Sequence, residues 1–347
     1  MGLFKTANIV SRADKISNFT VSTAEYGSAV MELLGTTRIS GNVIYYDDFT
    51  AHEHRETQRS GKGGGVKSTT ITYTYTAAVI MGLCEGPIKG IGRVWIDKEL
   101  YQYPSEKIGM TLYSGTADQQ PWPYVVGKHP EKALPYTGLA YMAGVIDLGN
   151  NASLPNFNFE VQGKLLDTGD GVDVNPADYI RYILDKVGLQ EVEIVGLENY
   201  RKYCRESDFL ISTPADYTSA KTARDIVNEI ASLTNAYMFW SNDRFKIVPR
   251  ADRPVGEWQP DKQIVYNLTA DDFLEQSNGA CVTYSRKDSS ELYNRFTVEF
   301  YNRENAYEKE SVSYEDSENI ADYGLRQAPH AHHVRILLII SIPKSVR

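Results

Sequence analysis

The sequence predicts a mainly β fold with an α/β insertion, and three observations support this prediction. Tyrosine occurs 24 times against 11 phenylalanines, and tyrosine suits half-buried strand faces and interfaces. Threonines at alternate positions from Thr70 to Thr76 interleave with larger residues, which is the period-two pattern of a β-strand. Between residues 176 and 233, in contrast, apolar residues recur at the three-to-four spacing of amphipathic helices.

Composition bounds the size and the partners of the protein. Its 347 residues, 42% of them hydrophobic, suffice for two or three domains of roughly 100–200 residues each. The net charge of -9 argues against tight binding of nucleic acid, which needs clustered Lys and Arg. It is compatible with a pore for DNA, because acidic walls would keep the polyanion from sticking.

The cysteines and the apolar segments indicate the compartment. Cys84, Cys204 and Cys281 are too far apart for a disulfide framework or a zinc site, and we interpret them as buried residues of a protein assembled in a reducing cytoplasm. The start of the chain does not resemble a signal peptide. The apolar run at residues 336–342 is shorter than the ~20 residues of a membrane span, so no stable membrane insertion is expected.

The pattern along the chain predicts five segments. Residues 1–35 form an arm that packs on a neighbour or on the first domain. Residues 36–165 are β-rich, with strands expected at 67–79, 91–100, 139–148 and 157–162. Residues 166–262 form an α/β section, residues 263–326 a second β-rich section with strands at 281–284, 295–301 and 309–314, and residues 327–347 an atypical tail.

The α/β section begins with a linker at residues 168–173. Asn175 is a helix N-cap and Pro176 the first helical residue, and Gly188 ends that helix. A second helix is expected at 219–233, and a hairpin at 236–250 turns at Ser241-Asn242-Asp243.

The segment GKGGGVKS at residues 61–68 contains glycines and a lysine, as phosphate-binding loops do. Val66 stands where such a loop requires its second glycine, the preceding run is polar, and a strand follows instead of a helix. We interpret the segment as a flexible surface hairpin. It supplies the candidate interface or lumen loop, which consists of Gly61, Lys62, Gly63, Gly64 and Gly65.

No metal or cofactor site is predicted. His52 and His54 would share one face of a strand, but no third ligand is suitably spaced and the surrounding run is charged and loop-like. Residues 170–173 lack the ligands of a calcium loop, and the histidines at 330, 332 and 333 are assigned no role.

No catalytic residues are predicted either, because the sequence contains neither G-x-S-x-G nor H-E-x-x-H. Arg201, Lys202 and Arg205 are flanked by acidic residues, so we interpret them as solvated surface. The sequence therefore favours an assembly component over an enzyme.

Four blocks of sequence, taken in order, resemble the hub or tail-tip proteins of long-tailed phages, prophages and gene transfer agents. They are Tyr26-Gly27 with LGTTRISGN at 34–42, the glycines at 61–65 with TYTYTA at 72–77 and GLCEGPI at 82–88, GRVWID at 92–97, and the helix and hairpin at 226–250. One departure is Lys98, since family members usually have Asp-Gly after the Trp strand.

The resemblance implies a trimeric hub whose tube-like β-barrel domains present a pseudo-sixfold ring to the hexameric tail. Residues 36–165 would be the first tube domain, 166–262 an insertion, and 263–326 the start of a second domain. Family chains continue beyond the position of Arg326, so the chain is either a truncated or frameshifted copy with an incomplete second domain or a natural short variant whose tail docks elsewhere. The hub would close the tail tube, organise tip attachments and form part of the DNA passage during ejection. Implied partners are the distal tail protein, the tail tube, the tape-measure protein, and fibre or tip proteins.

Two other functions are considered. A receptor- or glycan-binding module for host attachment would use exposed aromatic side chains, for which Trp122, Tyr124 and Tyr136 are the candidates. A cell-wall hydrolase component would need a cleft of carboxylates or a metal. In each case the expected location is the virion, at the tail tip, after assembly in the host bacterial cytoplasm.

Overall fold

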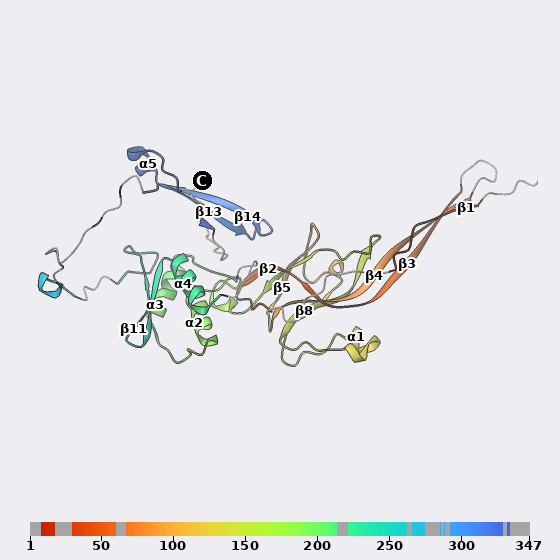
Figure 1. Ribbon diagram of the computed structural model, residues 1–347, viewed down its shortest axis with the longest axis horizontal. Coiled ribbons are helices and arrows are strands. Elements are labelled where there is room, and N and C mark those ends of the chain that lie inside the picture. Colours follow the sequence, from red (N-terminus) through yellow and green to blue (C-terminus); the bar gives the residue numbers. More distant parts are fainter. Residues whose placement is uncertain are drawn as a thin grey trace, which may run out of the picture. The chain divides into compact units, whose positions relative to one another are not determined.

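The computed structural model describes residues 8–17, 30–59, 67–213, 221–261, 266–274, 285, 288, 292–328 and 332–333. The chain divides into two compact units, the first ending at Asp167 and the second beginning at Thr168. Figure 1 shows the order of their elements. Among the described residues, no helix is long and apolar enough to cross a membrane.

The first unit is organised around one long strand, β4. This strand pairs antiparallel with β3 along one edge, and with β1 (parallel) and β8 (antiparallel) in succession along the other. The sheet consists of β1 (Asn8–Arg12), β3 (Asn42–Arg59), β4 (Lys67–Glu85), β7 (Thr111–Tyr113) and β8 (Leu139–Gly149). Alternate residues of β4 are buried from Ile71 to Ala77, and all are buried from there to Cys84, because β8 joins the sheet at this point.

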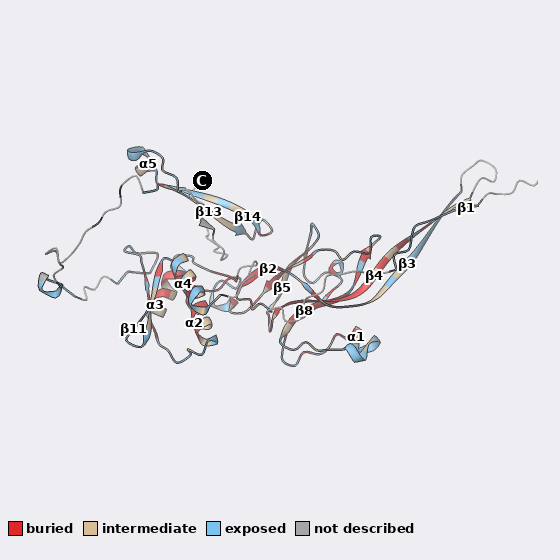
Figure 2. Cartoon of the chain, viewed as in Figure 1, coloured by how far each residue is buried: buried red, intermediate tan, exposed pale blue. Residues whose placement is uncertain are grey.

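A second antiparallel sheet of the first unit has the strand order β2-β9-β5-β6. Its strands are β2 (Thr36–Ser40), β5 (Gly90–Ile96), β6 (Glu99–Gln102) and β9 (Phe157–Gln162). Both sheets contribute to one hydrophobic core, in which Tyr75 and Met142 pack with Val94 and Phe159. Figure 2 shows this buried material along β4, β5 and β8.

The segment between β6 and β8, residues 103–138, lies along the first sheet, and we call it the excursion. It contains η1 (Glu106–Ile108), β7, α1 (Pro123–Lys128) and η2 (Pro130–Lys132). Trp122 and Val125 pack with Ala78, Ile80 and Tyr141. The excursion therefore covers the face of β4 and β8 opposite the main core.

The second unit contains a small sheet with helices on one face. The strand order is β10-β12-β11, with β10 (Ile194–Val195), β11 (Ala236–Ser241) and β12 (Arg244–Pro249). The helices are α2 (Pro176–Lys186), α3 (Leu197–Glu206) and α4 (Ala223–Leu233). Helix α4 packs against β11, α3 packs against β12, and α2 contacts both helices.

The same unit contains a separate sheet of order β14-β13-β15. Its elements are β13 (Arg295–Asn302), β14 (Glu308–Glu315) and β15 (His332–His333), with α5 (Ser317–Tyr323) after β14. Two short 3-10 turns, η3 (Leu166–Thr168) and η4 (Ala270–Asp272), complete the described elements.

The mainly β prediction is confirmed, and so are most predicted elements. Strands β4, β8, β9, β13 and β14, the hairpin β11–β12 and helices α2 and α4 lie where the sequence placed them. Asn175 caps α2 by accepting from Ala177 N at 3.0 Å. The strand predicted at 281–284 lies outside the described residues. The described sheets are open, since each ends in two different edge strands, so none closes into the expected barrel.

Three details of the prediction were wrong. The polar run at 51–59 belongs to β3 rather than to a loop, because its residues pair one by one with β4. The strand predicted at 91–100 is two strands, since Asp97 has a φ of 55° and the chain turns there. Helix α3 was not predicted, although Tyr200, Tyr203 and Cys204 are buried on one side of it.

Candidate functional site

Residues from two of the blocks that carry the resemblance meet around Trp95, together with Glu160. Arg38 of β2 places its guanidinium carbon 4.4 Å from the centroid of the Trp95 ring, and Arg93 of β5 places its own 5.2 Å away. Glu160 of β9 accepts from Arg93 Nε at 2.9 Å and from Nη2 at 2.5 Å. Trp95 is only 4% exposed. This cation–π cluster joins three adjacent strands and has the character of a framework rather than of a reactive site.

The glycines of two blocks allow backbone and side chains to approach closely. A Cβ on Gly92 would lie 2.7 Å from Glu160 Oε2, where it would displace the partner of Arg93. A Cβ on Gly86 would lie 2.5 Å from the Cα of Gly115, where only backbone is available to move. Gly86 therefore excludes any side chain for a steric reason, whereas a side chain at Gly92 would require the Glu160 carboxylate to move.

The Tyr-x-Tyr block fastens the N-terminal arm to β4. Tyr73 Oη accepts from Arg12 Nε at 2.8 Å and donates to Glu53 at 3.0 Å. The amide of Ile16 donates to Tyr75 Oη at 2.7 Å. The described part of the arm, residues 8–17, thus packs on its own first unit through β1 and these two hydroxyls.

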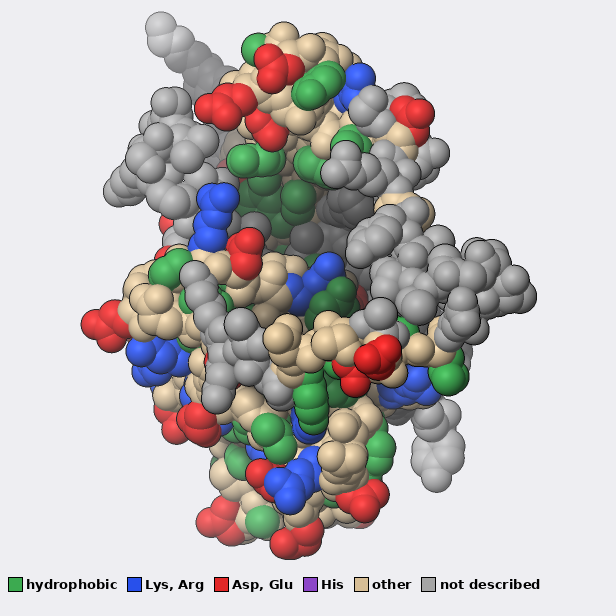
Figure 3. All heavy atoms as spheres, turned by 90° about the vertical axis from the view of Figure 1, so that its left-hand side faces the viewer, with side chains coloured by type: hydrophobic (Ala, Val, Ile, Leu, Met, Phe, Trp, Pro, Cys, Tyr) green, Lys and Arg blue, Asp and Glu red, His purple; other side chains and the backbone are tan. Residues whose placement is uncertain are grey.

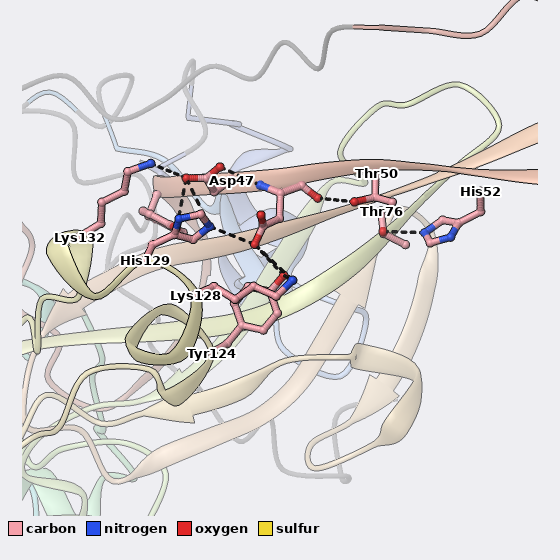
Figure 4. A network of polar contacts seen from close by, with 10 residues as sticks. Asp47, Thr50, His52, Thr76, Tyr124, Lys128, His129 and Lys132 are labelled. Atoms are coloured by element: carbon pink, nitrogen blue, oxygen red, sulfur yellow. Dashed lines mark hydrogen bonds and ion pairs between the residues drawn. The ribbon is translucent and has the colours of Figure 1, made fainter.

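A polar network holds the α1 excursion against β3 (Figure 4). Tyr124 Oη donates to Asp48 at 2.8 Å, His129 Nε2 lies 3.2 Å from the same carboxylate oxygen, and Lys132 Nζ donates to Asp47 at 2.6 Å. The register of β3 with β4 shifts between Asp47 and Thr50. We call this network the α1 latch; its members are Asp47, Asp48, Tyr124, Lys128, His129 and Lys132.

The electrostatics of the α1 latch favour a structural role over metal binding. Asp47, Asp48 and His129 could offer three ligand atoms within 4.8 Å of one another. However, the hydrogen bond from Lys132 lowers the pKa of Asp47, and the one from Tyr124 lowers the pKa of Asp48. Because ammonium groups already neutralise these carboxylates, a cation would have to displace them. The latch was not predicted from the sequence, in which its one local signal is the acidic pair at 47–48 inside an apolar strand.

The three candidate receptor-contact aromatics lie in and beside this network. Trp122 is 9% exposed and stacks on Tyr124, with ring centroids 4.8 Å apart. Tyr136 packs edge-on against Tyr141 at 5.7 Å. The structure therefore brings the three together, but in packed positions that favour a framework role.

The candidate loop Gly61, Lys62, Gly63, Gly64 and Gly65 lies outside the described residues. Its flanks are described: Arg59 is paired with Lys67, and β3 and β4 are antiparallel. Lys67 begins a strand and not the helix that a phosphate-binding loop requires.

The β3–β4 hairpin presents a polar face on the side opposite Tyr73 and Tyr75. His52 Nε2 lies 2.9 Å from Thr76 Oγ1, and His54 Nε2 lies 2.7 Å from Thr74 Oγ1. The two histidines do share a face, as expected, and each ring is bonded to a threonine across the strands. We define the polar face as His52, His54, Glu56, Thr70, Thr72, Thr74 and Thr76.

Two charged residues of the second unit, Asp173 and Arg201, form ion pairs that the sequence did not predict. Asp173, interpreted as part of a linker, is 0% exposed and accepts from Arg303 Nη1 at 2.8 Å and Nη2 at 2.7 Å. Ser212 also donates to it. Arg201, interpreted as solvated surface, pairs with Asp178 at 2.6 Å and so ties α3 to α2. Neither partner is close in sequence, so spacing alone could not reveal these pairs.

Comparisons with known proteins agree with this mainly β framework. Residues 222–333 match a family model described as putative phage tail protein. A chain from the virion of a native gene transfer agent particle has the same fold, with a TM-score of 0.61, 20% identity, and coverage of 97% of this chain and 72% of that one. No match was found among curated proteins.

Residues 222–333 are therefore similar in sequence to phage tail proteins, and the chain shares its fold with a chain of the gene transfer agent virion.

Proposed function

We propose that this chain is the hub subunit at the tip of a phage tail, where it closes the tail tube, organises tip attachments and lines part of the DNA passage. The observation that carries the proposal is the fold shared over 97% of the chain with a gene transfer agent virion chain. The sequence blocks add support, because their residues build the framework around Trp95 and the anchorage of the arm. On this proposal three copies form a ring in contact with the distal tail protein, the tail tube, the tape-measure protein, and fibre or tip proteins.

The composition of the polar face supports the proposal that DNA passes through the hub. A moving polyanion is held by clustered cations and repelled by clustered anions. The polar face contains four threonines, two histidines and one glutamate, and its histidines bond to threonines. Such a face offers DNA weak contacts of either sign, which suits transient passage without tight binding.

The test is the location of the chain in the particle together with its mass in solution. A reconstruction of the tail should place the chain on the tail axis as a closed ring. Light scattering behind size exclusion should give three times the chain mass of 39.0 kDa. A peripheral location would exclude the hub and favour a receptor-binding module instead. Release of peptidoglycan fragments by the purified chain would favour a hydrolase component.

A further inference from the structure

In the described part of the chain, the β10-β12-β11 sheet has helices on one face only. Ala236 and Ile247 point to the helices and are buried, at 5% and 2% exposure. On the other face Tyr237, Phe239 and Val248 are about half exposed, at 55%, 47% and 48%. An antiparallel sheet that faces water ordinarily has polar residues there, so this face has the composition of an interaction surface. Figure 3 views the molecule from the side on which β11 lies in Figure 1, and hydrophobic side chains reach the surface there among charged ones.

Two basic residues give this surface a positive charge. Lys246 is registered opposite Phe239, and the guanidinium carbon of Arg250 lies 4.3 Å from the Tyr237 ring centroid. Among the described residues neither has an acidic partner, whereas Arg244 is paired with Glu193 at 3.1 Å. We call this surface the aromatic face; it consists of Tyr237, Phe239, Lys246, Val248 and Arg250.

The β13–β14 hairpin also has two unlike faces. One is polar and internally satisfied, since Arg295 pairs with Glu315, Thr297 with Ser313 and Lys309 with Glu299. The other, which we call the hairpin face, consists of Phe296, Val298, Phe300, Asn302, Glu308, Glu310, Val312 and Tyr314. Tyr314 is 70% exposed and Phe296 is 36% exposed. A sheet this narrow is marginal in water unless its apolar face is covered.

The two faces are complementary in charge as well as in hydrophobicity. Along β12 and just beyond it, alternate residues are Lys246, Val248 and Arg250. Along β14 the alternate residues of the hairpin face begin with Glu308 and Glu310, followed by Val312 and Tyr314. Asn302 and Asn305 donate to Glu310 at 2.9 and 2.8 Å, and these bonds lower its pKa by favouring the charged form.

We propose that the aromatic face of one copy binds the hairpin face of a second copy of this chain. The residues of both faces are exposed or partly exposed in a single chain, and each face supplies the charge that the other lacks. A contact between two different surfaces is heterologous, so repetition of the contact generates a ring when the rotation closes. The proposal rests on the self-association within the proposed function and assigns residues to it. Both faces lie within residues 222–333, the region matched by the phage tail family model.

Charge reversal on each face tests the contact in the full-length chain. One variant combines Lys246→Glu with Arg250→Glu, and the other combines Glu308→Lys with Glu310→Lys. By light scattering over a range of concentrations, each variant alone should associate at least tenfold more weakly than the unmodified chain. An equimolar mixture should form mixed complexes, and a chain with all four changes should recover the original mass. The matched control is Arg253→Glu, an exposed reversal outside the aromatic face, which should leave association unchanged.

The outcomes separate this inference from the proposed hub. If the unmodified chain forms a ring and the Lys246→Glu, Arg250→Glu variant associates equally tightly, the assigned contact is wrong and the hub stands. A chain that stays monomeric at every concentration would exclude both. The double variants could be less stable to unfolding than the unmodified chain, with stability restored in the fourfold variant while every chain stays monomeric. That result would show that the two faces pair within one chain, and it would overturn the inference. The inference would also be overturned if the charge-reversal variants lost binding to another tail protein but kept their self-association. Circular dichroism of each variant confirms folding, and a Phe239→Cys, Val312→Cys chain should form cross-links only between copies.

Discussion

At the scale of single residues, the second unit depends on a carboxylate withdrawn from water. Asp173 has 0% exposure and Arg303 has 15% side-chain exposure, and their bidentate contact spans 130 positions of sequence. Removing two charges from water costs several kcal/mol per ion, which only good geometry and further hydrogen bonds offset. Ser212 supplies one such further bond. The pair therefore fixes the turn between β13 and β14 to the start of the α/β section.

Replacement of Asp173 by asparagine should destabilise the second unit strongly. The change leaves the Arg303 guanidinium without a counter-charge, and removal of one partner of a buried pair costs about 3–5 kcal/mol. Urea unfolding measures the free energy of unfolding. The control is Glu193→Gln, which breaks the exposed pair with Arg244 (55% and 60% side-chain exposure) and should cost at most about 1 kcal/mol. Equal effects of the two changes would contradict the assigned role.

At the scale of elements, helix α1 is held in place by the polar contacts of the α1 latch. A six-residue helix buries too few apolar side chains to be stabilised by packing alone. Helix α1 has no side-chain cap and buries only Val125, and helices this short are unstable in isolation. Contacts from β3 to Tyr124, His129 and Lys132 hold the segment instead. Its position should therefore depend on the charge of Asp47 and Asp48.

Acidification should release α1. Both carboxyl groups have a folded-state pKa below the ordinary value of 3.8, so their stabilising effect is complete above the unfolded pKa of about 3.9 and is lost as the pH falls through the lower folded values. The fluorescence of Trp122, taken as the difference from a Trp122→Phe chain, should change below about pH 4. Asp48→Asn should give the altered signal already at pH 7. Asp118→Asn, at an exposed position of the same excursion, should behave like the unmodified chain.

The N-terminal arm should be released by loss of two hydroxyl groups. In a chain with Tyr73→Phe and Tyr75→Phe, Arg12 Nε and the Ile16 amide lose the hydroxyl groups to which they donate, while both rings remain packed and Arg12 keeps its ion pair with Glu53. Each bond contributes about 0.5–1.5 kcal/mol, so trypsin should cleave after Arg12 several times faster, as measured by mass spectrometry. Tyr314→Phe, at a 70% exposed ring, serves as the control. Unchanged cleavage would show that β-pairing alone holds the arm.

Elements with a strong local signal could be predicted from the sequence, and those made by pairing could not. Strand β4 has strict alternation, and α2 has an Asn cap followed by Pro. The second half of β3 is polar on its own, and becomes a strand because threonines of β4 face its histidines. Helix α3 had a usable signal in Tyr200, Tyr203 and Cys204, at helical spacing. The α1 latch and the Asp173 pair join distant residues, so the local pattern contained no sign of them beyond the acidic pair at 47–48.

At the scale of the whole molecule, each unit has its own interior. The core of the first unit includes Tyr75, Met142 and Phe159, and the second unit buries Ile180, Tyr200 and Ile230 within its helical section. Units with separate cores unfold as separate cooperative blocks. Damage to one should therefore leave the other intact.

Gly86→Ala should loosen the first unit alone. The new methyl would lie 2.5 Å from the Cα of Gly115, and overpacking of this kind costs about 1–3 kcal/mol. Hydrogen exchange followed by mass spectrometry should show faster exchange in β4 and β8, with α2 and α4 unchanged. Gly127→Ala is the matched control, because nothing lies within 4 Å of a Cβ there. Faster exchange in both units would show that they unfold together.

The contact between Gly86 and Gly115 also limits how this protein can change over generations. A methyl group on either residue meets the backbone of the other, at 2.5 Å in one direction and 2.7 Å in the other. A substitution at Gly86 does not make a substitution at Gly115 more tolerable, or the reverse, because the second methyl group adds to the steric clash made by the first. No single substitution of either glycine can therefore be accepted unless the two backbone segments first move apart. In a mutant library under selection, the two positions should therefore tolerate glycine alone, even though neither residue performs any chemistry.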